Sequence, residues 1–128
     1  MASQDIRLRL VIRRHGVPEV KLVWPCACTD NFTVSRLLEQ VNEVITLESG
    51  EWGLEDYAVE LSDGKGGSFE CLHFQPVGRI LKDEDQVLIR SLLSDDLKCR
   101  RLSGRHQITA DGSHLVDGVA FGRTRGRE

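Results

Sequence analysis

The sequence predicts an α+β domain in which one helix packs on one mixed β-sheet. Two runs with alternating apolar residues flank a Gly/Pro turn near the start of the chain, and a stripe with helical spacing follows them. Further short alternating runs occupy residues 57–92. Side chains repeat every two residues in strands and every 3.6 in helices, so these patterns separate the two kinds of element.

Residues 6–13 and 19–24 are expected to form a β-hairpin. In each run the apolar residues alternate with polar or charged ones, and Gly16 and Pro18 favour a turn between them. The core-facing residues of the first run are Ile6, Leu8, Leu10 and Ile12. Pro25 is expected to end the second strand, because proline cannot donate a hydrogen bond to a ladder.

A helix is expected after three candidate N-cap residues, Asp30, Asn31 and Thr33. One apolar stripe follows at three- and four-residue steps, made of Val34, Leu37, Leu38, Val41, Val44 and Ile45. We expect the helix to fade near Leu47 and to end before Gly50.

Three further strands are expected at residues 57–61, 69–74 and 86–92. A glycine-rich turn at 63–67 joins the first two, with Ala58 and Glu60 facing away from the core. Residues 76–81 should bend over the core, and 82–85 form a polar turn before the last strand. Such a sheet has one face on the helix and one face open.

The element order resembles the ubiquitin-like β-grasp superfamily over residues 5–93. The phrase Gly78-Arg79-Ile80-Leu81-x-x-x-Asp85-x-Val87-Leu88-Ile89-Arg90 looks like the turn that leads into the last, central strand of that fold. Together with Arg-Leu-Arg-Leu at residues 7–10, it looks most like the amino-terminal ubiquitin-like domain of coilin-type nuclear scaffold proteins. That resemblance implies self-association and a nuclear location.

The chain is expected to divide into three parts: a β-grasp domain at 1–93, an extension at 94–121 and a flexible basic tail at 122–128. Residues 102–105 look like a linker, and Asp111-Gly112 between two β-prone runs predicts a hairpin. The apolar residues Ile108, Leu115, Val119 and Phe121 are expected to pack on the domain, since an isolated hairpin is marginal in water.

The composition indicates a soluble, intracellular domain without catalytic machinery. The chain is 40% hydrophobic and 29% charged, and no apolar run suggests a membrane span or a signal peptide. No catalytic motif is present. Cys26, Cys28, Cys71 and Cys99 lack the ligand spacing of zinc sites, so they are expected to be reduced thiols, and no metal or cofactor is expected.

Charge is divided unevenly along the chain. Residues 1–97 hold 10 Lys and Arg against 17 Asp and Glu, whereas residues 98–128 hold 7 against 3. One strand face is expected to carry a basic strip, formed by Arg7, Arg9, Arg13, Lys21 and Arg90. Such a row can be a docking surface, or it can be a solubilised open face with cross-strand pairing to Glu60 or Glu70, and the sequence leaves both interpretations open.

Two functions are therefore expected. The first is a non-enzymatic protein-interaction or self-association module at the N-terminus of a larger nuclear scaffold or adaptor. Its basic strip would meet an acidic turn on a second copy, formed by Asp83, Glu84 and Asp85. The alternative is an RNA-binding accessory domain that uses the strip and three tail arginines, Arg123, Arg125 and Arg127. Neither a small-molecule substrate nor a membrane is expected as a partner.

Overall fold

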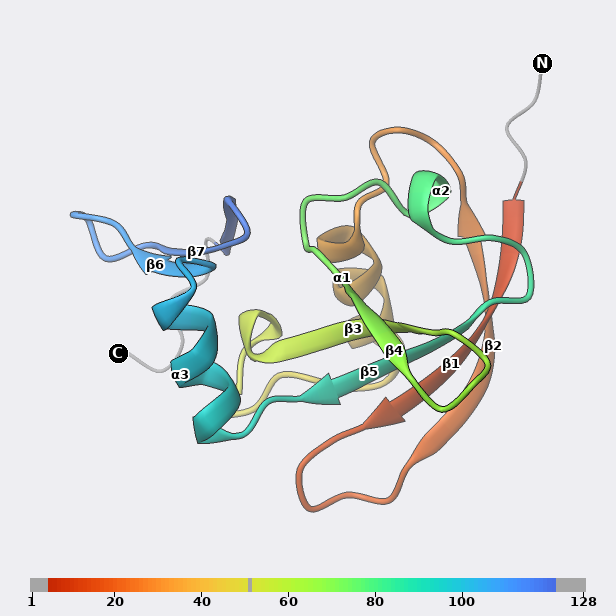
Figure 1. The fold of residues 1–128 in the computed structure, drawn as a ribbon, viewed down its shortest axis with the longest axis horizontal. Helices are drawn as coiled ribbons and strands as arrows, with labels where there is room; N and C mark the ends of the chain where they lie inside the picture. Colours follow the sequence, from red (N-terminus) through yellow and green to blue (C-terminus); the bar gives the residue numbers. More distant parts are fainter. Residues whose placement is uncertain (1–4, 51, 122–128) are drawn as a thin grey trace.

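The computed structural model describes residues 5–50 and 52–121. Within these ranges, five strands form a mixed sheet in the order β2-β1-β5-β3-β4. The strands are β1 (Asp5–Arg13), β2 (Val20–Ala27), β3 (Tyr57–Ser62), β4 (Ser68–Cys71) and β5 (Gln86–Ser91). The central pair β1 and β5 is parallel, the other pairs are antiparallel, and helix α1 (Val34–Val44) lies against one face (Figure 1). The chain therefore has an α+β fold of the ubiquitin-like type.

The N-terminal hairpin forms as predicted, but its second strand is longer. Pro25 does not end β2, which continues to Ala27. Pro25 pairs with Arg7, whose own N–H donates to Asp83 Oδ1 at 2.8 Å, on the side away from β2. Because β2 is an edge strand and this pair needs no proline donor, the strand tolerates Pro25.

Helix α1 begins directly after Thr33, one of the three predicted N-cap residues. Thr33 is the N-cap, and its Oγ1 accepts from the Arg36 N–H at 3.4 Å. The stripe buries Val34, Leu37, Leu38 and Val41 against core strand residues such as Leu10 and Ile89. The prediction was wrong for Val44, which is 67% exposed, because the helix stops there and Leu47 takes the buried position. The Asn42 side chain fixes this exit by accepting from the Leu47 and Glu48 N–H groups.

The second half of the sheet is shorter than predicted. β4 ends at Cys71, and His73 and Phe74 lie in a turn; His73 is fully buried whereas Phe74 is half exposed. A short 3-10 helix, η1 (Leu54–Asp56), leads into β3, and a single helical turn, α2 (Val77–Ile80), bends over the core. Gly78 in α2 lies so close to Cys28 that a Cβ there would be 3.1 Å from the Cys28 Cβ.

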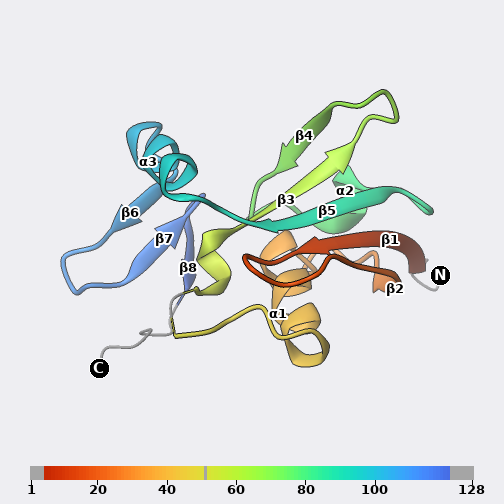
Figure 2. The ribbon, with the colours of Figure 1, turned by 90° about the horizontal axis from the view of Figure 1, so that it is seen from below.

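Residues 94–121 form a helix and a second sheet. Helix α3 (Ser94–Leu102) was not predicted, and it includes the first residue of the expected linker. The expected hairpin is present as β6 (His106–Ile108) and β7 (His114–Val116), and β8 (Val119–Phe121) extends it to three strands. These elements gather at the end of the molecule opposite the start of β1 (Figures 1 and 2). No helix in the described ranges is long and apolar enough to cross a membrane.

Candidate functional site

The face of the sheet opposite α1 is here called the outer face. Strand register places Arg9, Val11 and Arg13 of β1 on it, beside Val23 and Lys21 of β2. The other side of β1 faces β5, whose outer residues are Gln86, Leu88 and Arg90. β3 adds Ala58 and Glu60, and β4 adds Glu70. The structure therefore brings together the basic residues that the alternation assigned to one side of the sheet.

Arg7 lies at the end of this face, where it contacts the acidic turn of its own chain. Its Nε donates to Glu84 Oε2 at 2.7 Å, and its backbone N–H donates to Asp83 Oδ1. The contact with Glu84 raises the pKa of Arg7. Asp85 caps the same turn by accepting from the Lys82 N–H at 2.7 Å. The proposed basic and acidic partners thus already meet within one chain.

Arg9 keeps a different kind of contact. Its Nε donates to the backbone carbonyl of Glu84 at 3.2 Å, and this neutral acceptor does not compensate its charge. Arg13 and Lys21 share one carboxylate: Glu19 is 2.7 Å from Arg13 Nε and 3.8 Å from Lys21 Nζ. The hydrogen bond from Arg13 lowers the pKa of Glu19. Three cations and one anion leave this part of the face basic.

Arg90 is held more firmly than the other predicted arginines. It lies 3.0 Å from Glu60 on β3 and 3.3 Å from Asp96 in the first turn of α3. Ala58, which pairs with Arg90, was expected to face solvent but is fully buried. Arg90 therefore ties the sheet to α3, and this contact gives it a structural role.

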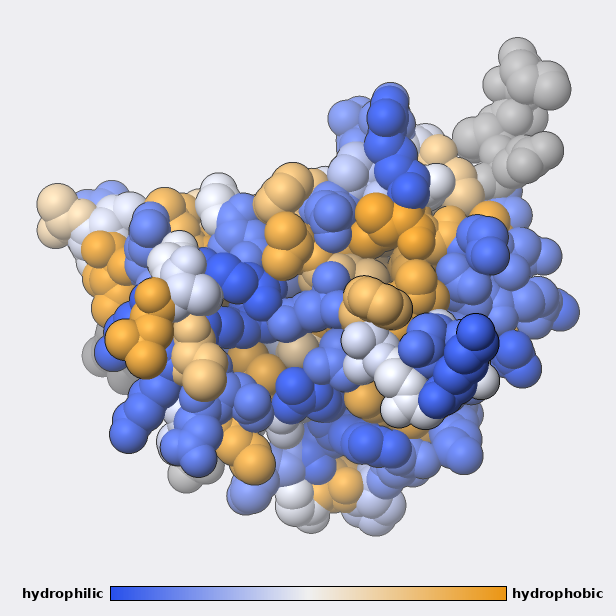
Figure 3. Space-filling model, in the orientation of Figure 1, coloured by the Kyte–Doolittle hydropathy of each residue, from blue (hydrophilic) through white to orange (hydrophobic). Residues whose placement is uncertain are grey.

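Apolar side chains occupy the middle of the outer face. Val11 and Leu88 are neighbours across β1 and β5, and Val23 on the edge strand is 56% exposed. Two adjoining hollows of about 300 and 330 Å³ cover this area and share Val11 and Gln86. We call the two together the outer-face groove. Other apolar groups are visible in the orientation of Figure 1, over α3 with β6 and between β4 and α2 (Figure 3).

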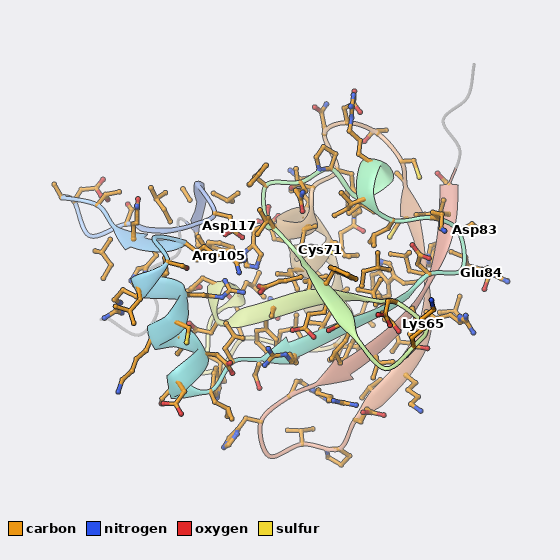
Figure 4. All side chains as sticks on the ribbon, in the orientation of Figure 1. Lys65, Cys71, Asp83, Glu84, Arg105 and Asp117 are labelled. Atoms are coloured by element: carbon orange, nitrogen blue, oxygen red, sulfur yellow. The ribbon has the colours of Figure 1, made fainter. Side chains whose placement is uncertain are left out.

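A second cluster joins the extension to the body, and sequence reasoning missed it. Arg105 makes paired contacts with Asp117, at 2.6 and 2.9 Å, and with Glu70 on β4, at 2.9 and 3.0 Å. Arg100 of α3 contacts the same Glu70 at 2.6 Å. We call these four residues the seam cluster; Figure 4 shows Arg105 and Asp117 pointing toward one another, far from Asp83 and Glu84.

The seam cluster compensates a repulsion within the sheet. Glu60 and Glu70 stand directly opposite each other on β3 and β4, and like charges in this position are unfavourable. Arg90 neutralises one carboxylate, and the two arginines of the extension neutralise the other. The only sequence signal for this was the paired carboxylates, which gave no indication of which arginines would reach them.

Asp117 is the residue of the extension that reaches deepest into the body. Its side chain is 2% exposed, and its Oδ2 accepts from the backbone N–H of His73 at 2.9 Å. Burial opposes its ionisation, but hydrogen bonds from Arg105 and His73 outweigh burial, so the pKa of Asp117 is lowered. Its φ of 54° is in the left-handed region, which Asp and Asn tolerate better than most residues.

Histidines lie on both sides of the seam. His73 Nε2 is 3.1 Å from the Tyr57 carbonyl, and its ring meets Phe121 edge-on at 5.4 Å. Burial, with nearby Arg100, lowers the pKa of His73 to about 4. In the extension, His106 Nε2 and His114 Nδ1 are 3.0 Å apart, and burial lowers the pKa of His106. Phe121 packs against the core, which anchors β8.

The two buried cysteines, Cys26 and Cys71, have thiols that are hard to ionise. All four are free, and burial raises the pKa of Cys26 to about 12 and that of Cys71 to about 11. Thiols this hard to ionise behave as small apolar residues. In residues 5–50 and 52–121, no three His, Cys, Asp or Glu side chains converge as a metal site would require. The predicted tail residues Arg123, Arg125 and Arg127 lie outside the described residues.

Comparisons with known proteins complete this description. A family model described as a domain of unknown function (DUF7357) matches residues 6–128. A search of curated proteins finds no match. Among solved structures, the chain is similar to the C-terminal ubiquitin-like domain of mouse tubulin-specific chaperone e, with 16% sequence identity and a TM-score of 0.44. That similarity covers 70% of this chain and 91% of the other.

Proposed function

Since the chain belongs to the family described as a domain of unknown function (DUF7357), whose description assigns no activity, we propose a function from the geometry alone. The domain is a non-enzymatic protein-interaction module, and it docks its partner on the outer face of the sheet. The observation that carries this proposal is the outer-face groove, an apolar strip bordered by charged side chains.

The composition of the groove supports docking of a protein. Val23 and Leu88 offer apolar surface on either side of the largely buried Val11, while Arg9, Arg13 and Lys21 border it. An apolar centre with a polar rim is the usual organisation of a protein interface. Helix α1 occupies the opposite face (Figure 2), and α3 and the residues after it contact the outer face at Arg90 and Glu70. The part of the outer face over β1 and β2 remains available.

Self-association is the finer form of this proposal. It rests on the coilin-type resemblance of residues 7–10 and 78–90, as does a nuclear scaffold role. The head-to-tail contact expected between Arg7 and the turn at 83–85 would have to compete with the same contact within each chain. A self-associating form would therefore need a contact other than the one between Arg7 and this turn, and light scattering at low salt would detect it as a mass that rises with concentration.

RNA binding is less well supported by the described residues. Base stacking on aromatic side chains is a common way to hold single strands. Among residues 5–50 and 52–121, the outer face has no aromatic side chain, because Trp24, Tyr57 and Phe69 all belong to the helix side by register. Its basic residues also alternate with acidic ones.

The test compares two matched variants in affinity capture from cell extract with quantitative mass spectrometry. Val23→Asp places a charge in the groove, whereas Val44→Asp changes a slightly more exposed valine at the end of α1. We expect Val23→Asp to lose, and Val44→Asp to retain, a defined protein that the wild type captures. The captured protein must then bind the purified domain directly. If both variants keep every partner of the wild type, the outer face is not the docking surface.

A further inference from the structure

The partner of the outer-face groove can be described by its chemistry. We propose that the groove binds an extended segment of a different protein, in which aliphatic side chains alternate with Asp or Glu. This inference rests on the proposed docking function and adds the class of partner.

The first step is the charge at the β2 end of the groove. The hollow there is lined by Arg9 and Lys21 and by no acidic side chain. Arg9 donates only to a backbone carbonyl in its described contact, and Lys21 is 3.8 Å from a carboxylate that Arg13 holds at 2.7 Å. The lining of this hollow therefore carries two cations and no anion, although Arg9 also borders a neighbouring hollow that contains Asp63, Glu84 and Asp85. A carboxylate of the partner placed beside Lys21 would meet a complementary charge.

The second step is the apolar floor. Val23 is 56% exposed on the edge strand and pairs with Arg9, whereas Val11 pairs directly with Lys21, so the two valines are diagonal neighbours across the β1–β2 pairing. The two hollows meet at Val11 and Gln86, and the second continues over Leu88. A segment lying across the strands thus meets an apolar strip next to basic side chains. A partner segment that complements this strip therefore has apolar residues directly beside acidic ones in its sequence.

The third step excludes a second copy as the source of the acidic group. The acidic turn is the chain's own candidate, and each of its residues is already engaged. Asp83 accepts from the Arg7 N–H, Glu84 pairs with the Arg7 guanidinium, and Asp85 accepts from the Lys82 N–H. A second copy could use these carboxylates only after releasing contacts that its own fold already makes, so we assign the segment to another protein.

The experiment is a fluorescence anisotropy titration of the full chain with a labelled nonapeptide, Gly-Asp-Val-Glu-Val-Asp-Ile-Glu-Gly. Two comparison peptides replace the acids with Asn and Gln or the aliphatic residues with Ser. We expect both comparison peptides to bind at least fivefold more weakly. Binding should also weaken several-fold between 50 and 500 mM salt, since exposed charges are screened.

Protein variants locate the contact. Arg9→Gln and Lys21→Glu should each weaken binding of the acidic peptide by about fivefold, which is the usual size of one exposed charge contact. Lys98→Glu, an exposed charge reversal on α3, is the control and should leave the affinity unchanged. Backbone amide shifts on peptide addition should centre on Val11 and Val23. Melting temperatures close to the wild-type value would show that the variants are folded.

Three outcomes would overturn the inference. The acidic peptide may bind no better than its neutral form, or Lys98→Glu may weaken it as much as Lys21→Glu. The groove would be assigned to nucleic acid if a labelled single-stranded oligonucleotide bound more tightly than the acidic peptide at equal salt and shifted the same backbone amides. If the peptide fails while Val23→Asp still loses a captured protein, the docking function stands and only this partner class is wrong.

Discussion

The buried His73 makes the stability of the fold depend on pH in a predictable window. His73 is fully buried, and it faces Arg100 of α3, Arg105 before β6 and Asp117 after β7, with the Tyr57 carbonyl accepting from Nε2. Burial lowers the pKa of His73 from its ordinary value of 6.5 to about 4. Below pH 6.5, the unfolded chain therefore binds a proton that the folded chain does not.

The magnitude follows from the difference between the two pKa values. The stability that depends on a neutral His73 is fully present above pH 6.5, and it is lost as the pH falls from 6.5 to about 4. Each pKa unit corresponds to about 1.4 kcal/mol, so the full window is worth about 3 kcal/mol. Asp117 does not obscure this loss, because its lowered pKa moves its own effect to more acidic conditions.

The assay is urea unfolding at pH 7.5, 5.5 and 4.5, followed by tryptophan fluorescence. His73→Gln keeps an N–H donor for the Tyr57 carbonyl but removes the titrating group. Between pH 7.5 and 4.5, the free energy of unfolding of this variant should therefore fall by about 2–3 kcal/mol less than that of the wild type. His106→Gln serves as a comparison, since His106 also has a lowered pKa and should account for a smaller part. Equal pH dependence in the wild type and His73→Gln would refute the reasoning.

Two further predictions concern packing and the seam cluster. Asp117→Asn keeps the left-handed backbone but loses both charge-assisted contacts to Arg105; it should lower the free energy of unfolding by about 2–3 kcal/mol and the melting temperature by roughly 10 °C in calorimetry. The control Asp111→Asn, in the exposed turn of the same extension, should have a clearly smaller effect, and equal effects of the two would contradict the role of the cluster. Gly78→Ala should destabilise by about 1 kcal/mol in urea unfolding, because the new Cβ would lie 3.1 Å from the Cys28 Cβ and 3.2 Å from its Cα. Gly50→Ala has open space and should be neutral, so a Gly78→Ala variant as stable as Gly50→Ala would show that the contact relaxes freely.

Local sequence patterns predicted the body of the fold because each pattern reflects a local physical constraint. The alternation at 6–13 gave the strand and its buried face, and Thr33 gave the start of α1. The errors occurred where a neighbour overrides a local rule. Pro25 remains in a strand because the strand is at an edge, and Val44 is exposed because Asn42 turns the chain toward Leu47.

The candidate site was predictable in part for the same reason. The period of two residues places Arg7, Arg9 and Arg13 on one face, and this needs no knowledge of the rest of the chain. Which of them retain uncompensated charge depends on acidic residues distant in sequence. Arg7 meets a turn 77 residues away, and Arg90 meets Glu60 30 residues away, so only the tertiary structure could separate paired from available cations.

The sequence by itself determined the α+β fold, the strand faces and the helix cap, because propensity and periodicity act over a few residues. Only the tertiary structure decided how the extension is held. Arg100, Arg105 and Asp117 look like ordinary surface residues in the sequence, yet they are partly or fully buried because Glu70 and the His73 N–H need partners at that place. Burial of charge depends on what the folded chain brings into contact, and a local pattern does not contain that information.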